Sequence, residues 1–417
     1  MAPVGYLPLF LEDFAYCLKS PMTFKVLPFA RRVPVKSEPP NSGADPYVSI
    51  GVIAWNEEEA IVPMLDSLFE QSFFVELAKR KLSCEVFCVA NGCSDRTAAV
   101  AAAAFDRQKH GNAQGDLVTS RVVELAERGK LNAWNHFVHK ISARDAKILF
   151  FIDADIHLHH RETLWNMLVA LEKDLQANVT VDLPRKDISF KSRRSLRERL
   201  SLGASEITGS ASAQLCAQLY CIRAEIARNI YLPKDLGACE DGFIKHLVCT
   251  DFLTHAGVAE RIRLAQPAEH TFEAYTSPLA IFKNQKRQII GQTLIHILVD
   301  CYLKELPLPQ RLQLAATLKE QDRNDPSWLK RLIREHLQRT RFFWRLYPGL
   351  ATHRLKSLAK LSPVNRLKCL PAAAAGSLVA LLASWMAYRS LKNGSTDYWP
   401  RASRLGLNNL EPRNQGA

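Results

Sequence analysis

The stretch ILFFIDADI, residues 148–156, decides the fold of this chain more than any other. Residues 148–152 form the apolar run of a buried β-strand, and two aspartates follow at Asp153 and Asp155. Because residues i and i+2 of an extended chain face the same way, both carboxylates can point at one spot. Burying two unpaired acids is costly, and a divalent cation that bridges phosphate oxygens would pair them. The alternative is a turn in which Asp155 only caps a helix.

Two apolar runs nearer the N-terminus show the same pattern of a buried strand that ends at polar residues. Residues 48–54 end at Asn56, a good helix N-cap, and residues 85–90 end at Asn91-Gly92. Strands that alternate with helices predict an α/β fold with a mostly parallel sheet, whose ligands lie beyond the carboxyl ends of the strands. The predicted helices span residues 61–68, 94–105, 133–140 and 162–171.

A second acidic pair, Glu240-Asp241, precedes a predicted helix that continues through Leu247. A carboxylate at a loop-to-helix junction can cap the helix. It can also act as a general base that removes a proton from an acceptor hydroxyl. The spacing alone leaves both interpretations open.

Five segments together resemble inverting family 2 glycosyltransferases with the GT-A fold, in which a mostly parallel sheet is flanked by helices. The resemblance extends over residues 47–287, and its segments occur in the order expected of that family. They are VSIGVIAWNEEEAI (48–61), FCVANGCSDRTAAVA (87–101), ERGKLNAWN (127–135), FFIDADI (150–156) and ACEDGFI (238–244).

This resemblance implies a donor site for a nucleotide sugar and a role for each matching residue. Lys130 would lie near the diphosphate or orient Asp153, and Asn91 stands where the family has an aspartate that contacts the base. The residues implied in donor binding are Ala54, Asn56, Glu57, Asn91, Lys130 and Asp153.

The resemblance also implies metal-assisted catalysis. Asp155 would be the principal ligand of Mg²⁺ or Mn²⁺, with Asp153 beside it and His270 as a third ligand, where a packed imidazole is the alternative. Asp241 would be the catalytic base for inverting transfer. Metal and Lys130 would stabilise the departing nucleoside diphosphate.

Two departures from the family pattern bear on specificity. Ala90-Asn91 replaces acidic residues, which weakens any assignment of uracil as the base. The segment 285–289, QKRQI, only partly resembles the Gln-x-x-Arg-Trp signature of processive synthases, because Ile289 stands in place of the aromatic residue. We therefore expect transfer of one sugar per encounter.

Composition and charge indicate a folded protein with an anionic partner. The 417 residues are 47% hydrophobic and 23% charged, which excludes wholesale disorder, and the net charge is +13. The basic excess builds up after about Lys283. Ten scattered cysteines without a CxxC pair are typical of a reducing cytosol, and the N-terminus is a poor signal peptide.

The C-terminal part predicts contact with a membrane. The segment 328–347 interleaves aromatic residues with cations, and 370–388 is a continuous apolar run near the lower limit for crossing a bilayer. A packed helix and a solvated face are the respective alternatives. We expect the enzyme at the cytoplasmic face of a membrane, anchored by a C-terminal helix or peripheral, with a glycan or lipid-linked acceptor.

Three other functions compete with the glycosyltransferase interpretation. A sugar nucleotidyltransferase would want a Gly-rich loop after the first strand, which Trp55-Asn56-Glu57 does not supply; a scaffold on a decayed transferase fold would not need the intact aspartates. Nucleic-acid binding rests on charge alone, and no such partner is expected.

The predicted organisation of the chain has five parts. They are residues 1–46 (extension and linker), 47–290 (catalytic domain), 291–369 (basic amphipathic helices), 370–388 (candidate membrane helix) and 389–417 (polar tail).

Overall fold

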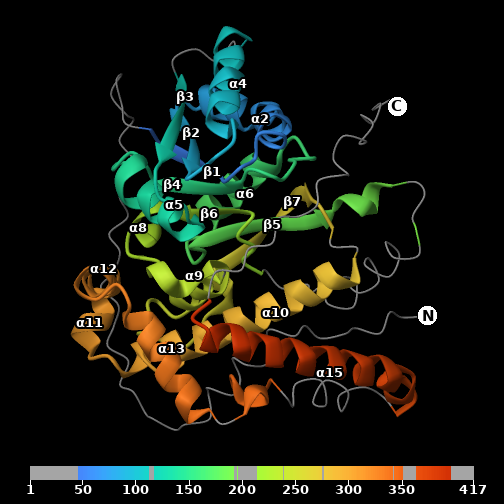
Figure 1. The fold of residues 1–417 in the computed structure, drawn as a ribbon. Coiled ribbons are helices and arrows are strands. Elements are labelled where there is room, and N and C mark those ends of the chain that lie inside the picture. Colours follow the sequence, from blue (N-terminus) through green and yellow to red (C-terminus); the bar gives the residue numbers. More distant parts are fainter. Residues whose placement is uncertain are drawn as a thin grey trace.

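The computed structural model describes residues 46–111, 117–191, 195, 214–237, 239–274, 277–340, 342–350 and 363–395. The predicted N-terminal linker and most of the predicted tail therefore lie outside the described residues. A seven-stranded sheet forms the centre, in the order β3-β2-β1-β4-β6-β5-β7 (Figure 1). Its strands are β1 (Val48–Ala54), β2 (Cys84–Asn91), β3 (Val118–Leu125), β4 (Ile148–Asp153), β5 (Val179–Lys186), β6 (Leu219–Arg223) and β7 (Ile262–Phe272).

The sheet is mostly parallel, as the sequence predicts. Strands β3, β2, β1 and β4 run parallel to one another, and β7 runs parallel to β5. Strand β6 is the exception, because it pairs antiparallel with both β4 and β5. Strands β1, β2 and β4 are buried along their whole length, which explains why they read as continuous apolar runs rather than alternating ones.

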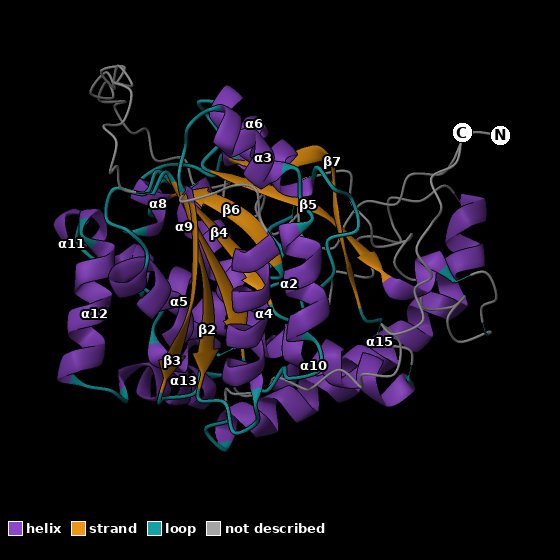
Figure 2. Ribbon diagram, turned by 90° about the horizontal axis from the view of Figure 1, so that it is seen from above, coloured by secondary structure: helices purple, strands orange, loops and turns teal. Residues whose placement is uncertain are grey.

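Helices cover both faces of the sheet, and alternate residues of the central strands enter two separate cores. Ile50 and Phe150 pack on one face, whereas Ile53 and Phe151 pack on the other. Figure 2 shows the strands with α2 and α4 on one side and α5 on the other. The first face is covered by α2 (Ile61–Phe69), α3 (Phe73–Lys79), α4 (Thr97–Gly111) and α6 (Thr163–Lys173). The second is covered by α5 (Lys130–His136), α8 (Ala224–Ala227), α9 (Glu240–Cys249) and α10 (Pro278–Ile295).

The C-terminal helices share the second core with the sheet. Leu318, Trp328 and Ala383 belong to the same buried cluster as Phe151, and the predicted boundary at residue 290 falls within α10. Helix α15 packs along α10 and contains the predicted segment 370–388. Among the residues that the structure describes, no helix is long and apolar enough to cross a membrane. The helices of this region are α11 (Leu308–Leu312), α12 (Leu314–Asn324), α13 (Trp328–Arg339) and α15 (Pro363–Lys392).

Candidate active site

Three neighbouring parallel strands end together, and this brings the predicted site residues to one edge of the sheet. In the register of β1 and β4, Ile53 lies opposite Asp153, and in that of β1 and β2, Ala54 lies opposite Ala90. The residues that follow these strands therefore meet at the carboxyl edge, where parallel sheets bind ligands.

Lys130 is the centre of this edge, because its ammonium group joins two segments far apart in the sequence. It lies 2.7 Å from Asp153 Oδ1 and 3.3 Å from Glu240 Oε1. It also donates a hydrogen bond of 3.4 Å to the carbonyl oxygen of Ala217, before β6. Gly129, which precedes it, has a φ of 149° and thereby begins α5 at the sheet edge. Lys130 and Asp153, both expected at the donor site, are thus in direct contact.

The net effect of burial and the neighbouring charges is to raise the pKa values of both Lys130 and Asp153. Burial opposes the charge of Lys130, but Asp153 and Glu240 together raise its pKa above the usual value. Burial raises the pKa of Asp153 to about 6, and the nearby charges of Asp155 and Glu240 add to this against the opposing effect of Lys130. Acids outnumber this one lysine, so the cluster retains surplus negative charge.

Asp241 lies in the first turn of α9, directly after Glu240, and belongs to the Lys130 cluster. Burial raises the pKa of Asp241 to about 6, with Glu240 as the next cause, whereas Arg287 and Lys130 act in the lowering direction. Its Oδ1 accepts a hydrogen bond of 2.7 Å from the backbone of Gly242. The helix begins one residue earlier, at Glu240, so Asp241 is not the N-cap residue, and its carboxylate is available for chemistry as well as for the helix end.

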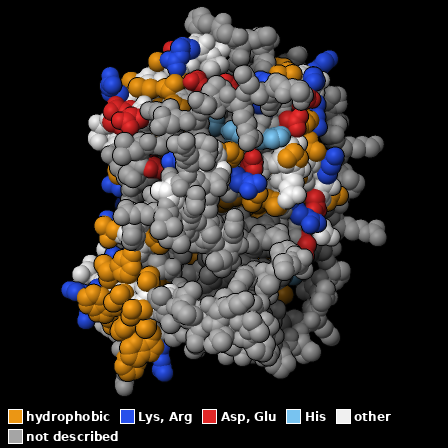
Figure 3. All heavy atoms as spheres, turned by 90° about the vertical axis from the view of Figure 1, so that its right-hand side faces the viewer, with side chains coloured by type: hydrophobic (Ala, Val, Ile, Leu, Met, Phe, Trp, Pro, Cys, Tyr) orange, Lys and Arg blue, Asp and Glu red, His pale blue; other side chains and the backbone are white. Residues whose placement is uncertain are grey.

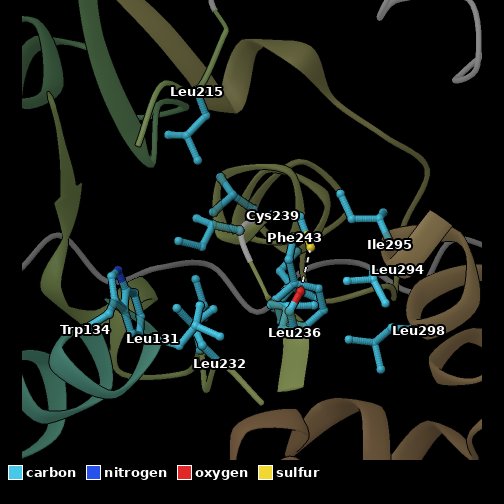
Figure 4. Close-up of a cluster of buried hydrophobic side chains, with 14 of the residues drawn as sticks. Leu131, Trp134, Leu215, Leu232, Leu236, Cys239, Phe243, Leu294, Ile295 and Leu298 are labelled. Atoms are coloured by element: carbon cyan, nitrogen blue, oxygen red, sulfur yellow. Dashed lines mark hydrogen bonds between the residues drawn. The ribbon is translucent and has the colours of Figure 1, made fainter. Parts of the chain in front are cut away.

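Gly242 allows this helix to approach α10 closely. A Cβ atom at this position would lie 2.3 Å from Cδ1 of Ile295, a distance that real side chains do not show. Behind this contact lies the apolar cluster of Figure 4, where Phe243 and Cys239 of the α9 region face Leu294 and Leu298 of the α10 region. The position of the candidate base is therefore fixed by apolar packing rather than by a flexible loop.

A stack of three aromatic rings forms the floor of the site. The ring of Phe151 stacks on that of Trp134, with 5.3 Å between the centroids, and on that of Tyr220, with 4.8 Å between the centroids. Trp134 Nε1 donates a hydrogen bond of 2.7 Å to the Tyr220 hydroxyl, so both polar tips are satisfied while buried. These rings line a small pocket that also contains Lys130, Asp153 and Glu240, with room for about one water molecule.

The predicted donor loop after β1 is tied to the loop after β2. Asn56 has a positive φ of 55°, and its side-chain oxygen accepts a hydrogen bond of 2.7 Å from the backbone of Ser94. The backbone of Glu57 donates to Thr97 Oγ1 at 2.7 Å. These contacts hold Ala54, Asn56 and Glu57 in one fixed loop at the carboxyl edge, beside the Lys130 cluster.

Asn91 is only 2% exposed, and its side chain binds backbone groups. Its Nδ2 donates to the Ala54 carbonyl at 2.6 Å, and its Oδ1 accepts from the Gly129 backbone at 3.0 Å. The side chain thus joins the ends of β1 and β2 to the start of α5. Both ends of the amide are engaged, and the contact of Asn91 with the donor base stays a prediction.

The imidazole of His270 is packed against two polar side chains. Its ring is fully buried, with Nδ1 at 2.7 Å from Asp182 Oδ2 and Nε2 at 3.4 Å from Gln218 Oε1. Within the described ranges, no three His, Cys, Asp or Glu side chains come together closely enough to hold a metal ion. Asp182 and Gln218 contact the imidazole and Lys130 contacts Asp153, so metal binding by Asp153, Asp155 and His270 stays a prediction.

Two features of the site were missed by the reasoning from the sequence. Glu240 forms the second ion pair of Lys130, and the stack of Trp134, Phe151 and Tyr220 supports both partners. The only signal in the sequence was the position of Glu240 beside Asp241. A pair between residues 110 positions apart depends on the sheet order, which the local pattern does not contain.

The chain is similar to one known protein family and to several solved structures. Residues 49–220 match the model of a family described as glycosyl transferase family 2. Among solved structures, Staphylococcus aureus TarS (residues 1–349) is 15% identical, with a TM-score of 0.39, and the alignment covers 84% of this chain and 92% of that one.

A second structure is Mycobacterium tuberculosis glucosyl-3-phosphoglycerate synthase in complex with Mn²⁺, UDP-glucose and phosphoglyceric acid. It is 17% identical, with a TM-score of 0.39, and the alignment covers 63% of this chain and 81% of that one. No curated protein matches the sequence. The family match runs from β1 to β6, so it includes Lys130 and Asp153 but not Glu240 or Asp241.

Proposed function

We propose that this enzyme transfers a single sugar from a nucleotide-sugar donor to a hydroxyl group of a glycan or lipid-linked acceptor, with inversion at the anomeric carbon. The observation that carries the proposal is the convergence of Lys130, Asp153, Glu240 and Asp241 at the carboxyl edge of the sheet. These residues come from β4, α5 and α9, and only the fold brings them together. The donor would lie along the fixed loop that follows β1.

Asp241 is the general base in this proposal. Burial and the charge of Glu240 raise its pKa to about 6, which makes it a stronger proton acceptor than an ordinary aspartate while it remains mostly ionised at pH 7. It would take the proton of the acceptor hydroxyl as the oxygen attacks the anomeric carbon. Because the hydroxyl attacks from the side opposite the nucleotide, the configuration inverts.

Lys130 has two tasks in the proposal. Its ion pairs hold Asp153 and Glu240 in place, and its positive charge lies where the nucleoside diphosphate would leave. A fixed cation at that point stabilises negative charge as it develops in the transition state.

The acid-rich cluster is chemically suited to a divalent cation, although it supplies few ligands of its own. Asp155 and Asp153 offer hard oxygen atoms and surplus negative charge, and a third ligand from the described residues is not at hand. We propose that Asp155 binds Mg²⁺ or Mn²⁺ together with the donor's diphosphate oxygens. Bound there, the cation would neutralise charge on the leaving group.

The acceptor in this proposal is met at the cytoplasmic face of a membrane. The support is the basic excess of the C-terminal region, which favours an anionic surface.

A donor screen tests the proposal directly. Wild-type protein is incubated with a panel of nucleotide sugars, with Mn²⁺, Mg²⁺ or chelator, and both thermal stabilisation and release of free nucleotide are measured. A bound donor raises the melting temperature by mass action, so we expect one donor to do so in the presence of metal. The variant Asp106→Asn, which changes an exposed acid of α4, is the matched control. Absence of stabilisation and of nucleotide release across the whole panel would contradict the proposal.

A further inference from the structure

From residue 376 onward, helix α15 presents most of its large apolar side chains outward and buries small ones together with Leu391, whereas a helix that packs in water buries its large apolar side chains. The small residues that face the core are Ala383, Ser384 and Ala387, each 1% exposed or less. The residues that face away include Leu378, Leu382 and Trp385, which are 61%, 50% and 44% exposed. The hydrophobic effect alone would bury the larger side chains.

Small residues at the contact explain how α15 packs closely against its neighbours in the C-terminal core. This distribution, with small residues between helices and large apolar residues outward, is the one that helices adopt when lipid rather than water surrounds them. A soluble helix instead shows one apolar face toward the core and polar residues outward. The outward face of α15 therefore fits an apolar environment.

An aromatic pair beside α15 enlarges this surface. The rings of Phe342 and Trp344 stack at 4.6 Å, and both are substantially exposed, next to α15. Arg345 lies over the ring of Phe342, and Arg389 lies 5.0 Å above Trp385. Aromatic rings with adjacent cations are typical of protein surfaces at the bilayer interface. We call these exposed side chains the apolar face; they are Phe342, Trp344, Leu378, Val379, Leu381, Leu382, Trp385 and Met386.

Figure 3 shows hydrophobic side chains gathered at the lower left of one side of the molecule, with Lys and Arg at their edge. The acidic side chains on that side lie higher. Contiguous apolar patches bordered by charge mark interaction sites on folded proteins.

Charge decides which partner covers the apolar face. From residue 336 to residue 396 the chain has ten Lys and Arg and no Asp or Glu. A second copy of the chain would bring the same positive charge to the contact. The segments 1–45 and 396–417 each carry a net charge of +1 and so offer no complement. Anionic lipid offers both the apolar interior and the negative charge.

We propose that the apolar face docks the enzyme in the plane of an anionic lipid bilayer, with α15 lying on the surface rather than crossing it. Helix α15 packs on α10, and α10 packs on α9, the helix of Asp241. The lipid surface would thus be two helix layers from the candidate base. This inference rests on the membrane contact in the proposed function and assigns that contact to the apolar face. Lipid binding can be measured without donor or acceptor.

Vesicle sedimentation with the full-length protein tests the proposal. Vesicles of phosphatidylcholine alone are compared with vesicles that contain phosphatidylglycerol, at low and high salt. We expect binding to the anionic vesicles, weakened by salt, and at least tenfold weaker binding for Leu382→Glu and Trp385→Glu. Leu175→Glu, at a residue 79% exposed in the loop between α6 and β5, is the matched control and should bind as wild type.

Several outcomes would overturn this assignment. They are the absence of wild-type binding, equal binding to neutral and anionic vesicles, or equal loss in the Leu175→Glu control. Sedimentation velocity adds a further test, since a wild-type dimer that Trp385→Glu converts to monomer would assign the face to a second copy. Unchanged melting temperatures for the variants show that they remain folded, as is usual for surface substitutions.

Discussion

The Lys130 cluster and the His270–Asp182 pair are both buried contacts between a basic and an acidic residue, yet they have different surroundings. Lys130 joins Asp153 and Glu240 at a pocket on the carboxyl edge of the sheet. His270 and Asp182 are both fully buried, and their contact joins β7 to β5. The comparison teaches that residue type alone does not identify a site. What separates the two is access to a pocket and a surplus of charge that a ligand could balance.

The largest effect is expected when Asp241, the candidate base of the Lys130 cluster, is replaced. We expect Asp241→Asn to lower kcat about 10²–10⁴-fold, because the amide cannot take the acceptor proton, while donor binding stays near wild type. Steady-state kinetics and donor titration measure the two effects. The control Asp106→Asn should leave kcat unchanged. If Asp241→Asn turned over at the wild-type rate, Asp241 would not be the base.

Removing the cation tests whether the cluster is also structural. Lys130→Met leaves Asp153 and Glu240 buried without a partner, and breaking a buried pair in this way costs about 3–5 kcal/mol. Urea unfolding measures the loss, which should come with loss of transfer activity. Lys79→Met removes an exposed ion pair with Glu76 and should change stability by less than about 1 kcal/mol. Equal effects of the two substitutions would contradict the central role of Lys130.

For the buried His270–Asp182 pair we expect a loss of stability with little loss of activity. We expect His270→Phe to lower the free energy of unfolding by about 1–3 kcal/mol, since buried Asp182 loses its partner, while kcat stays within a few-fold of wild type. Asp182→Asn is the companion variant and should behave similarly. A large fall in kcat with a raised metal requirement for His270→Phe alone would instead support the prediction that His270 is a metal ligand.

The smallest expected effect is on pH dependence. Asp241 must be deprotonated to act as a base, and its pKa is raised to about 6, so kcat/KM should fall as the pH drops through that value. Since the charge of Glu240 raises the pKa of Asp241, Glu240→Gln should move this acidic limb to lower pH. Profiles of kcat/KM from pH 5 to 8 measure the shift. A limb that stays in place, or moves upward, would show that Glu240 does not set the proton affinity of the base.

Much of the fold follows from local sequence. The strands after which the site residues lie were predicted within one or two residues, because buried parallel strands are continuous apolar runs that end at polar turns. The convergence of Lys130 on Asp153 was anticipated through a family resemblance rather than from spacing.

The remaining details depend on tertiary contacts. The side chain of Asn91 is engaged by Ala54 and Gly129, whose position beside it is set by strand register. Glu240 pairs with Lys130 only because β6 and α9 return to the end of β4. No local pattern distinguishes an amide that faces a ligand from one that binds backbone, so the sequence could name these residues without assigning their partners.

The close approach at Gly242 puts the end of one apolar side chain next to the backbone that follows Asp241. An added methyl group at Gly242 would meet Cδ1 of Ile295, the terminal atom of a side chain that can change rotamer, so Gly242→Ala requires Ile295 to turn aside. The spacing beside the candidate base therefore depends on the rotamer of Ile295 and not on any acid or base.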